Sequence, residues 1–265
     1  DEGVKYNHPD LIDNVWVNED EIPANGIDDD NNGYVDDIHG WNFLSTSDYP
    51  KTISWSEDGD KGHGTHVAGT VAAVNHNGIG VGGVAGGSGK GDGVKIMSCQ
   101  VFSGNSSATV AARAKAYEYA ANNGACIIQC SFGLPGGNVT SDGVFEKTYN
   151  VEVAGIEYFV NYRQAYSPVD RNFAIFASGN DAYHLAGYPA AHRDVIAVSS
   201  FGPDFLPAVY TNYGPGTNIS APGGDSSINM TAESNRASIL STVPSDCPAY
   251  DTDYGYMEGT SMACP

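Results

Sequence analysis

Apolar residues in the middle of the chain fall into two patterns, short continuous runs and stripes of helical spacing. The continuous runs predict buried strands over Val94–Phe102, Ala125–Cys130, Phe173–Ala177, Val195–Ser200 and Ala208–Tyr210. Spacings of three and four residues predict helices over Thr109–Asn123, followed by Gly124 as a suitable cap, and over Val144–Tyr162. Strands and helices that alternate in this way predict an α/β fold with a doubly wound, mostly parallel sheet and helices on both faces.

A further helix is predicted around two neighbouring histidines. Apolar and small residues continue after His63 with helical spacing, namely His66, Val67, Ala68, Val71 and Val74. His63 is therefore expected on, or just before, a helix N-terminus. Zinc binding by His63 and His66 is the alternative, but the pair has no nearby third ligand motif and no His-Glu-x-x-His pattern.

Length and charge narrow the class of protein. A chain of 265 residues fits one large domain with a substantial core, and no repeat, low-complexity tract or linker divides it. The net charge of −20, from 12 basic and 32 acidic residues, argues against a nucleic-acid partner, which requires a basic face. No apolar run reaches the roughly 18 residues of a membrane-spanning helix, and no signal peptide is visible.

Five cysteines are too few for a disulfide scaffold at this length, and an odd number leaves at least one unpaired. Cys99, Cys126 and Cys130 lie in apolar runs and are expected to be buried as small hydrophobic residues. Cys247 is expected to be the most exposed of the five. Cys264 follows the candidate nucleophile closely, but packing is the preferred interpretation.

Three residues could form a nucleophilic site. Ser261 lies in Met257–Pro265 among small residues and is expected to be exposed at a helix start. A serine needs a general base and a group that holds the base in the right tautomer. His63, flanked by glycines that allow close approach, and Asp1 are the candidates, although a single histidine or aspartate is more often structural or solvated.

An acidic loop over Asn25–Asp37 predicts a calcium site. Counted from its first aspartate, positions one, three, five, seven and nine of an EF-hand loop are Asp28, Asp30, Asn32, Tyr34 and Asp36. Gly33 falls at position six. The match is partial because His39 stands where a bidentate glutamate belongs and no helix pattern flanks the loop. We expect an EF-hand-like loop that stiffens an insertion.

Four motifs in sequence carry a family resemblance: Asp1-Glu2-Gly3, Gly62-His63-Gly64-Thr65-His66, Ala177-Ser178-Gly179-Asn180 and Gly259-Thr260-Ser261-Met262-Ala263. Together, in the chain order Asp, His, Ser that is known from subtilisin, they resemble the subtilisin-like serine protease family. The serine motif also differs from the Gly-x-Ser-x-Gly elbow of the α/β-hydrolases. The resemblance extends over nearly the whole chain.

The resemblance implies roles for particular residues. Ser261, His63 and Asp1 would form the catalytic triad, and Asn180 would donate to the oxyanion, although an asparagine in a turn can also be structural. Candidate substrate-binding residues are Ser103, Gly104, Ser131, Phe132, Gly133, Ser178, Gly179 and Gly187. Gly187 would leave room at the pocket floor, and Asp181 would lie at the rim.

The resemblance also implies calcium ligands at Asp10 and Asn77, no cofactor for catalysis, polypeptide substrates, a monomer and a secreted or cell-surface location. Residues 1–265 resemble a catalytic domain that lacks the family's strand before Asp1 and its helix after Ser261. Glu2 departs from the Ser or Thr usual after the aspartate, and we expect Asp1 and Glu2 to point to opposite sides. The alternative function is a calcium-stabilised pseudo-protease or peptide-binding module without catalysis.

Overall fold

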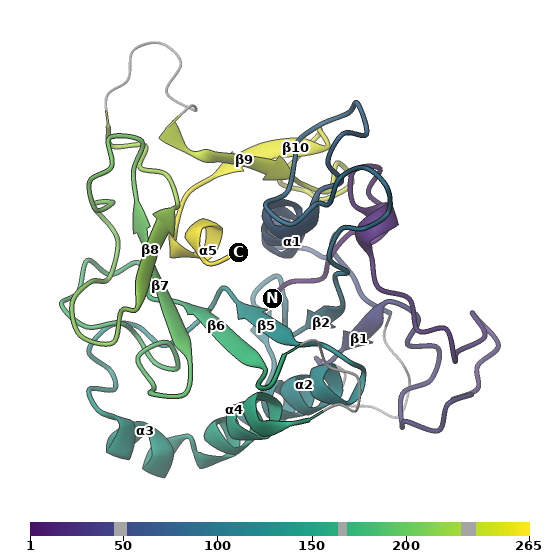
Figure 1. Ribbon diagram of the computed structural model, residues 1–265, viewed down its shortest axis with the longest axis horizontal. Helices are drawn as coiled ribbons and strands as arrows, with labels where there is room; N and C mark the ends of the chain where they lie inside the picture. The colour runs from purple at the N-terminus through teal and green to yellow at the C-terminus, as the bar shows by residue number, and fades with distance from the viewer. Residues whose placement is uncertain (45–51, 164–168, 229–236) are drawn as a thin grey trace. The chain divides into compact units, whose positions relative to one another are not determined.

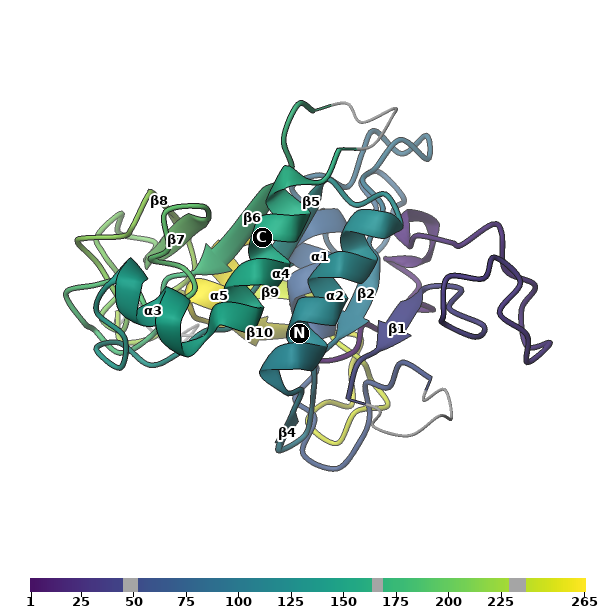
Figure 2. The ribbon, with the colours of Figure 1, turned by 90° about the horizontal axis from the view of Figure 1, so that it is seen from below.

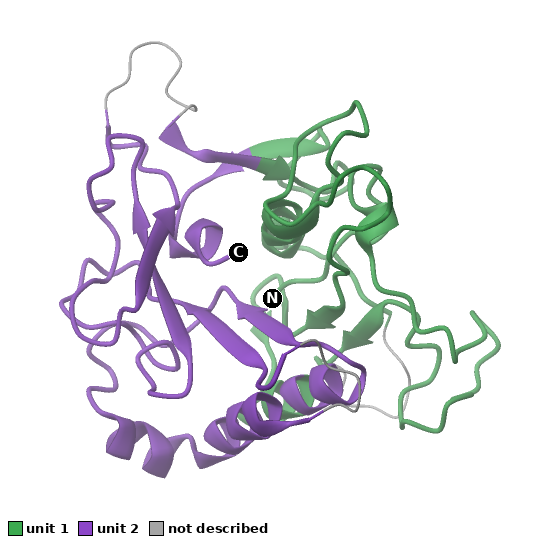
Figure 3. Ribbon diagram, in the orientation of Figure 1, with its two compact units in different colours: residues 1–116, 241–255 green, residues 117–240, 256–265 purple. Residues whose placement is uncertain are grey.

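A computed structural model describes residues 1–44, 52–163, 169–228 and 237–265, and the chain divides into two compact units. Unit 1 comprises Asp1–Ala116 and Ser241–Gly255, and unit 2 comprises Tyr117–Leu240 and Tyr256–Pro265 (Figure 3). The division falls within helix α2 (Val110–Asn122) and within strands β9 (Ile239–Thr242) and β10 (Tyr254–Met257), which pair with each other. No helix in the described ranges is long and apolar enough to cross a membrane.

Unit 1 contains short elements joined by long loops. Its elements are the 3-10 helix η1 (Ile12–Asn14), β1 (Gly40–Asn42), α1 (His63–Ala72), β2 (Ser98–Gln100), β3 (Phe102–Ser103) and β4 (Ser106–Ser107). Strands β1 and β2 pair in parallel, and β3 and β4 form an antiparallel hairpin. One core cluster joins the N-terminal segment to α1 through Val4, Leu11, Val15 and Ala68. The segment that begins at Asp1 is thereby packed against the helix that begins at His63.

Unit 2 is built on a parallel sheet in the order β5 (Ile127–Cys130), β6 (Phe173–Ala177), β7 (Ile196–Phe201) and β8 (Ile219–Pro222) (Figure 1). Side chains alternate between its two faces. Ala177 and Val198 pack with Ala263 of helix α5 (Thr260–Ala263), whereas Phe176 contacts the ring of Tyr117 in α2. Helix α4 (Asn150–Asn161) packs along β6 (Figure 1, Figure 2). The α/β fold with helices on both faces is confirmed.

The single helix predicted over 144–162 is wrong, because the chain forms α3 (Asp142–Thr148) and α4 with a break at Tyr149. Tyr149 has φ −119° and ψ 35°, which lies outside the helical region. Phe145 and Val153, on either side of the break, belong to one core cluster. The apolar stripe therefore continues through the break, and periodicity alone does not reveal it.

Two strand predictions also need correction. Ala208–Tyr210 is a turn, next to an isolated bridge between Phe201 and Pro207, and the strand beside β7 is β8. The side chain of Val209 is 64% exposed, so this apolar run does not enter the sheet. In the predicted strand Val94–Phe102 only Ser98–Gln100 and Phe102, the first residue of β3, belong to named strands.

The cysteine expectations are confirmed in part. Cys130 and Cys264 are buried, and Cys99 and Cys126 are partly buried. The expectation that Cys247 is the most exposed is wrong: it is 3% exposed, and its Sγ lies 3.1 Å from the carbonyl oxygen of Asp60. A polar sequence context around Cys247 did not reveal this contact, which joins residues distant in sequence.

Gly64, the second residue of α1, provides a test of the packing in unit 1. A Cβ at this position would lie 2.2 Å from the carbonyl oxygen of Glu2. In an open helix, Gly→Ala stabilises by about 1 kcal/mol. We expect Gly64→Ala instead to lower the free energy of unfolding by about 1–3 kcal/mol, because the Glu2 backbone must move.

The matched control is Gly143→Ala in α3, where a Cβ would meet no heavy atom within 4 Å. This substitution is expected to stabilise by roughly 0.5–1 kcal/mol. Chemical denaturation of both variants in a Ser261→Ala background gives the comparison. Equal effects of the two substitutions would show that the close approach at Gly64 is absent.

Candidate active site

Asp1 and His63 form a short hydrogen-bonded pair in unit 1. His63 is the first residue of α1, as expected, and Gly62 before it has φ 69°, the left-handed region that glycine tolerates. The Oδ1 atom of Asp1 lies 2.7 Å from Nδ1 of His63. With the Nδ1 proton donated to Asp1, Nε2 is left as the acceptor of a neutral imidazole. This is the tautomer that a general base requires.

Backbone contacts hold Asp1 in place. Its carbonyl oxygen accepts hydrogen bonds from the N–H groups of Val101 (2.8 Å) and Phe102 (3.1 Å). Its carboxylate also accepts from the N–H of Glu2 at 2.7 Å. The aspartate is thus fixed at both its backbone and its side chain before it meets the histidine.

Glu2 contacts the same histidine from another direction. Its carboxylate accepts from the backbone N–H of His63 at 2.8 Å and from that of Lys61 at 3.2 Å. A carboxylate at a helix start satisfies N–H groups that have no partner within the helix and interacts favourably with the helix dipole. The expectation that Asp1 and Glu2 point to opposite sides missed that both carboxylates serve His63, one at its ring and one at its backbone.

Burial lowers the pKa of the His63 imidazole to about 4, and the negative charge of Glu2 opposes that shift. A histidine with a lowered pKa is neutral at pH 7. His63 is therefore in the form that can accept a proton.

Ser261 and Ser131 form two reciprocal hydrogen bonds in unit 2. Ser261 is the second residue of α5. The helix follows Gly259, which has φ 147°. It is 9% exposed, so the expectation of an exposed serine is wrong. Its Oγ donates to the carbonyl oxygen of Ser131 at 3.3 Å, and the Ser131 hydroxyl donates to the Ser261 carbonyl at 2.8 Å. The backbone N–H of Ser261 makes no hydrogen bond to another described residue, as expected for the first turn of a helix.

Asn180 follows β6 and is held by Thr260. Its Oδ1 accepts from both the N–H (2.9 Å) and the hydroxyl (2.8 Å) of Thr260. With both donors on Oδ1, the amide Nδ2 is left as the exposed donor, and it makes no hydrogen bond to another residue in the described part of the chain. The sequence did not reveal Thr260 as the residue that orients this side chain.

Five of the predicted substrate-binding residues lie where three segments of unit 2 meet. Gly187 N–H donates to the Ser178 carbonyl, and Leu134 N–H donates to the Tyr188 carbonyl, both at 2.7 Å. A Cβ on Gly187 would lie 2.5 Å from the Leu134 carbonyl oxygen, so glycine here allows the two segments to approach. The segments contain Ser131, Gly133, Ser178, Gly179 and Gly187.

The structure also places the remaining residues of the predicted substrate pocket. The ring of Phe132 packs on Phe176 of the sheet, 5.8 Å between centroids, so any pocket wall here uses the backbone of Phe132. The carboxylate of Asp181 accepts from the Gly136 N–H at 2.8 Å, which engages part of its charge. Ser103 and Gly104 lie at the β3–β4 hairpin of unit 1, and Gly104 has φ 53°.

The acidic loop brings together a carboxylate that the motif did not include. Oxygen atoms of Glu21, Asp28 and Asp30 lie within 4.8 Å of one another. Glu21 is 5% exposed and accepts from the N–H of Asp29 at 2.8 Å. Oxygen ligands of this kind suit Ca²⁺. Glu21 precedes the loop by several residues, and no spacing rule connects it to the motif.

Of the other predicted calcium ligands, some are engaged in different contacts and two are in contact with each other. Asp36 turns its carboxylate to the N–H groups of Asn25 (3.1 Å) and Gly26 (3.0 Å), away from an EF-hand-like position nine, and its own φ is 54°. Asn32 donates to Asp30, and the Tyr34 ring contacts Trp41. Separately, buried Asp10 accepts from the amide of Asn77 at 2.6 Å, so these two are brought together.

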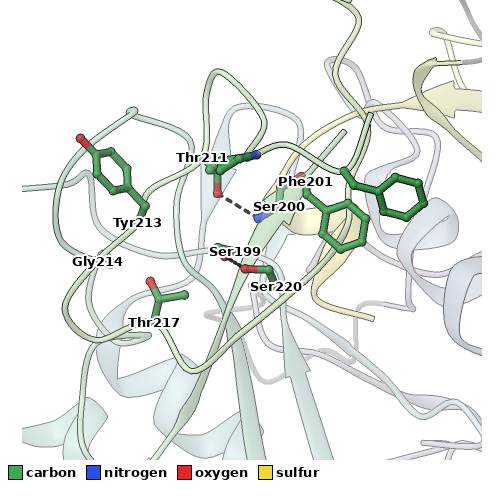
Figure 4. A pocket seen from close by; sticks show the side chains of 10 residues that line it. Ser199, Ser200, Phe201, Thr211, Tyr213, Gly214, Thr217 and Ser220 are labelled. Atoms are coloured by element: carbon green, nitrogen blue, oxygen red, sulfur yellow. Dashed lines mark hydrogen bonds between the residues drawn. The ribbon is translucent and has the colours of Figure 1, made fainter. Parts of the chain in front are cut away.

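A separate cavity of about 250 Å³ lies in unit 2 (Figure 4). Hydroxyl groups of Ser199, Ser200, Thr211, Thr217 and Ser220 line it together with aromatic rings. Neither Ser261 nor Asn180 is among the lining residues, so this cavity is not part of the candidate active site.

An aspartate-bound neutral histidine, a serine at a helix start and an oriented asparagine are the components of a serine hydrolase site. The family model described as Peptidase_S8, Subtilase family, matches residues 1–265. The chain therefore belongs to the subtilase family.

Relatives with curated descriptions include Subtilisin-like protease 1 of Plasmodium falciparum, 28% identical over 278 residues that cover 100% of this chain and 35% of the relative. Thermitase of Thermoactinomyces vulgaris is 28% identical over 265 residues, 100% of this chain and 69% of the relative. The chain thus spans only about a third of the length of the Plasmodium protein.

Solved structures of similar fold include Sphericase, with a TM-score of 0.65 and 24% identity over 100% of this chain and 71% of that one. A protease from Pseudoalteromonas arctica has a TM-score of 0.64 and 28% identity over 100% of this chain and 72% of that one. These similarities confirm the subtilisin-like fold.

Glu2→Gln tests the electrostatics at His63. The substitution keeps a hydrogen-bond acceptor for the helix start but removes a negative charge that favours the imidazolium ion. The pKa of His63 is therefore expected to fall further below its ordinary value. NMR titration of the imidazole in a Ser261→Ala background measures it, with exposed Glu57→Gln as the control. An unchanged or raised pKa in Glu2→Gln would contradict this assignment.

Proposed function

We propose that the protein is a serine endopeptidase that hydrolyses polypeptides through an acyl-enzyme. The observation that carries the proposal is the 2.7 Å contact between Asp1 Oδ1 and His63 Nδ1, which gives a neutral histidine with Nε2 as the acceptor. Membership of the subtilase family supports the same chemistry.

In the proposed reaction Ser261 attacks the carbonyl carbon of the scissile peptide while Nε2 of His63 takes the hydroxyl proton. Asp1 keeps the imidazole oriented and stabilises its charge. His63 then protonates the leaving amine, and it activates a water that releases the acyl group. The pairing of His63 with Ser261 joins residues of the two units and rests on subtilase membership.

The oxyanion would be held by two donors of unit 2, the Nδ2 of Asn180 and the backbone N–H of Ser261. Each lacks a competing hydrogen bond to another described residue, so each is available to the charge that develops on the carbonyl oxygen. The loss of one such donor costs about 10²–10³ in kcat, a magnitude known from subtilisin itself.

Structural calcium ions, outside the reaction itself, are also part of the proposed function. We propose structural Ca²⁺ at the Glu21, Asp28 and Asp30 carboxylates, whose oxygen atoms lie close together, and at Asp10 with Asn77, whose side chains are in contact. Ca²⁺ would stiffen loops and take no part in the reaction. A monomer, extended polypeptide substrates and a secreted or cell-surface location complete the proposal.

Active-site labelling tests the catalytic function. A fluorophosphonate probe is expected to label the calcium-loaded protein, and Ser261→Ala is expected to abolish labelling and to lower kcat by about 10⁶, again as known from subtilisin. Exposed Ser56→Ala serves as the control, because it removes a hydroxyl that takes no part in the proposed reaction and keeps the nucleophile. Labelling or hydrolysis that survives Ser261→Ala would refute the nucleophile, and a folded protein that binds peptides without hydrolysis would support the non-catalytic module.

Calcium removal tests the acidic loop. Chelation is expected to lower the melting temperature, and Glu21→Gln is expected to remove part of the calcium-dependent stabilisation, because it deletes one charge from the cluster. Exposed Glu19→Gln is the matched control and should leave that stabilisation unchanged. Melting curves at several Ca²⁺ concentrations give the comparison. Equal behaviour of the two variants would show that Glu21 is no ligand.

A further inference from the structure

Three potential metal ligands meet in unit 2 outside the candidate active site. Asp142 and Glu146 lie four residues apart on α3, and His192 lies in the segment before β7. One carboxylate oxygen from each acid and a ring nitrogen of His192 lie within 4.8 Å of one another. A helical spacing of four places both carboxylates on one face of α3.

His192 is the unusual member of this group. It is 2% exposed, and its Nε2 has no hydrogen-bond partner among the described residues. The nearest carboxylate oxygen, Oε1 of Glu146, lies 3.5 Å from it. The ring packs against Phe145, 5.7 Å between centroids, which fixes its plane. Buried polar atoms are normally satisfied, so an unpartnered ring nitrogen in a group with two carboxylates points to a missing ligand.

We propose that Asp142, Glu146 and His192 bind a divalent transition-metal ion, with Zn²⁺ as the best fit. Imidazole nitrogen together with carboxylate oxygens is a donor set for Zn²⁺, whereas Ca²⁺ takes oxygen ligands alone. The group is therefore distinct in chemistry from the acidic loop at Glu21. It also lies apart in sequence from the residues of the proposed reaction.

Neighbouring residues contact two of the three proposed ligands. The hydroxyl of Tyr188 donates to Oδ1 of Asp142 at 2.9 Å. The other ring nitrogen of His192, Nδ1, accepts a hydrogen bond from the backbone N–H of Asp194 at 3.4 Å and lies 3.9 Å from Oδ2 of the same residue. Metal binding at Nε2 would move the ring proton to Nδ1, which would then donate to the Asp194 carboxylate in place of accepting from the Asp194 N–H. A carboxylate behind a ligating histidine is a common arrangement that fixes the tautomer.

Arg193 competes for the same carboxylates. Its guanidinium pairs with Oδ2 of Asp142 at 3.3 Å and also with Glu146. The Arg193 side chain is 58% exposed, so it can move into solvent when an ion takes its place. One monovalent guanidinium leaves a net negative charge on two carboxylates, and a divalent ion would neutralise both. Arg193 therefore sets the affinity of the site.

An ion here would brace a segment that carries predicted substrate-binding residues. Tyr188 supports Asp142, and the Tyr188 carbonyl accepts from the Leu134 N–H at 2.7 Å. Gly187, the neighbour of Tyr188, donates to the Ser178 carbonyl. The ion would thus link α3 to the segments that contain Gly187 and Ser178. The site itself does not depend on the proposed peptidase activity.

Metal titration tests the proposal without reference to activity. The protein in a Ser261→Ala background, saturated with Ca²⁺, is titrated with Zn²⁺ by calorimetry and with Co²⁺ by visible absorption. One ion per chain is expected, with Co²⁺ bands of low coordination number. Glu146→Gln and His192→Gln should each weaken binding by at least about 10–100-fold. Arg193→Gln should strengthen it, because it removes the competing cation.

Two controls separate this site from other histidines. Exposed His184→Gln should leave Zn²⁺ binding unchanged, and so should His63→Gln. Should His192→Gln fail to fold, the half-exposed Glu146→Gln and Arg193→Gln still predict opposite changes in affinity. The proposal is overturned if no Zn²⁺ binds, if Glu146→Gln leaves the affinity unchanged, or if His63→Gln abolishes binding.

Discussion

The hydrogen bond between Asp1 and His63 is the constraint on which unit 1 depends. A buried imidazole is useful as a base only when it is neutral and in one tautomer, and Oδ1 of Asp1 at 2.7 Å from Nδ1 fixes that tautomer. The contact requires the first residue of the chain and the first residue of α1 to meet. Gly64 makes this possible because the Glu2 backbone passes where a Cβ would lie. The Glu2 carboxylate also accepts a hydrogen bond from the His63 N–H, which further connects the two segments.

Unit 2 positions its groups by a different device, the carboxyl ends of adjacent parallel strands. Strand β5 ends at Cys130 and β6 at Ala177, and the two strands are hydrogen-bonded neighbours. Ser131 and the segment that leads to Asn180 therefore leave the sheet at the same edge. Helix α5 packs on the sheet through Ala263, as does Cys264 directly after it, and this contact brings Thr260 and Ser261 to that edge. Regular structure, and not loop geometry alone, orders these side chains.

Features that depend on neighbouring residues in the chain could be predicted from the sequence. The apolar run Phe173–Ala177 is β6 with the expected bounds, and His63 begins a helix as the spacing after it indicates. Four short motifs identified the family because they combine residue type, order and glycine content. The break at Tyr149 was missed because the apolar stripe passes through it without interruption. Burial of Cys247 and the place of Glu21 were missed because each depends on a contact with residues that no periodicity relates to them.

The hydrogen bonds that hold Asn180 determine what deamidation of this residue to aspartate would change. Oδ1 is committed to two donors of Thr260, and a carboxylate oxygen would satisfy those donors equally well. Deamidation of this exposed asparagine to aspartate would therefore leave the fold and its packing intact. The remaining atom would change from an N–H donor to a negatively charged oxygen, which would repel the oxyanion of the proposed reaction. A deamidated molecule would therefore remain folded but would lack one of the two donors that the proposed reaction requires.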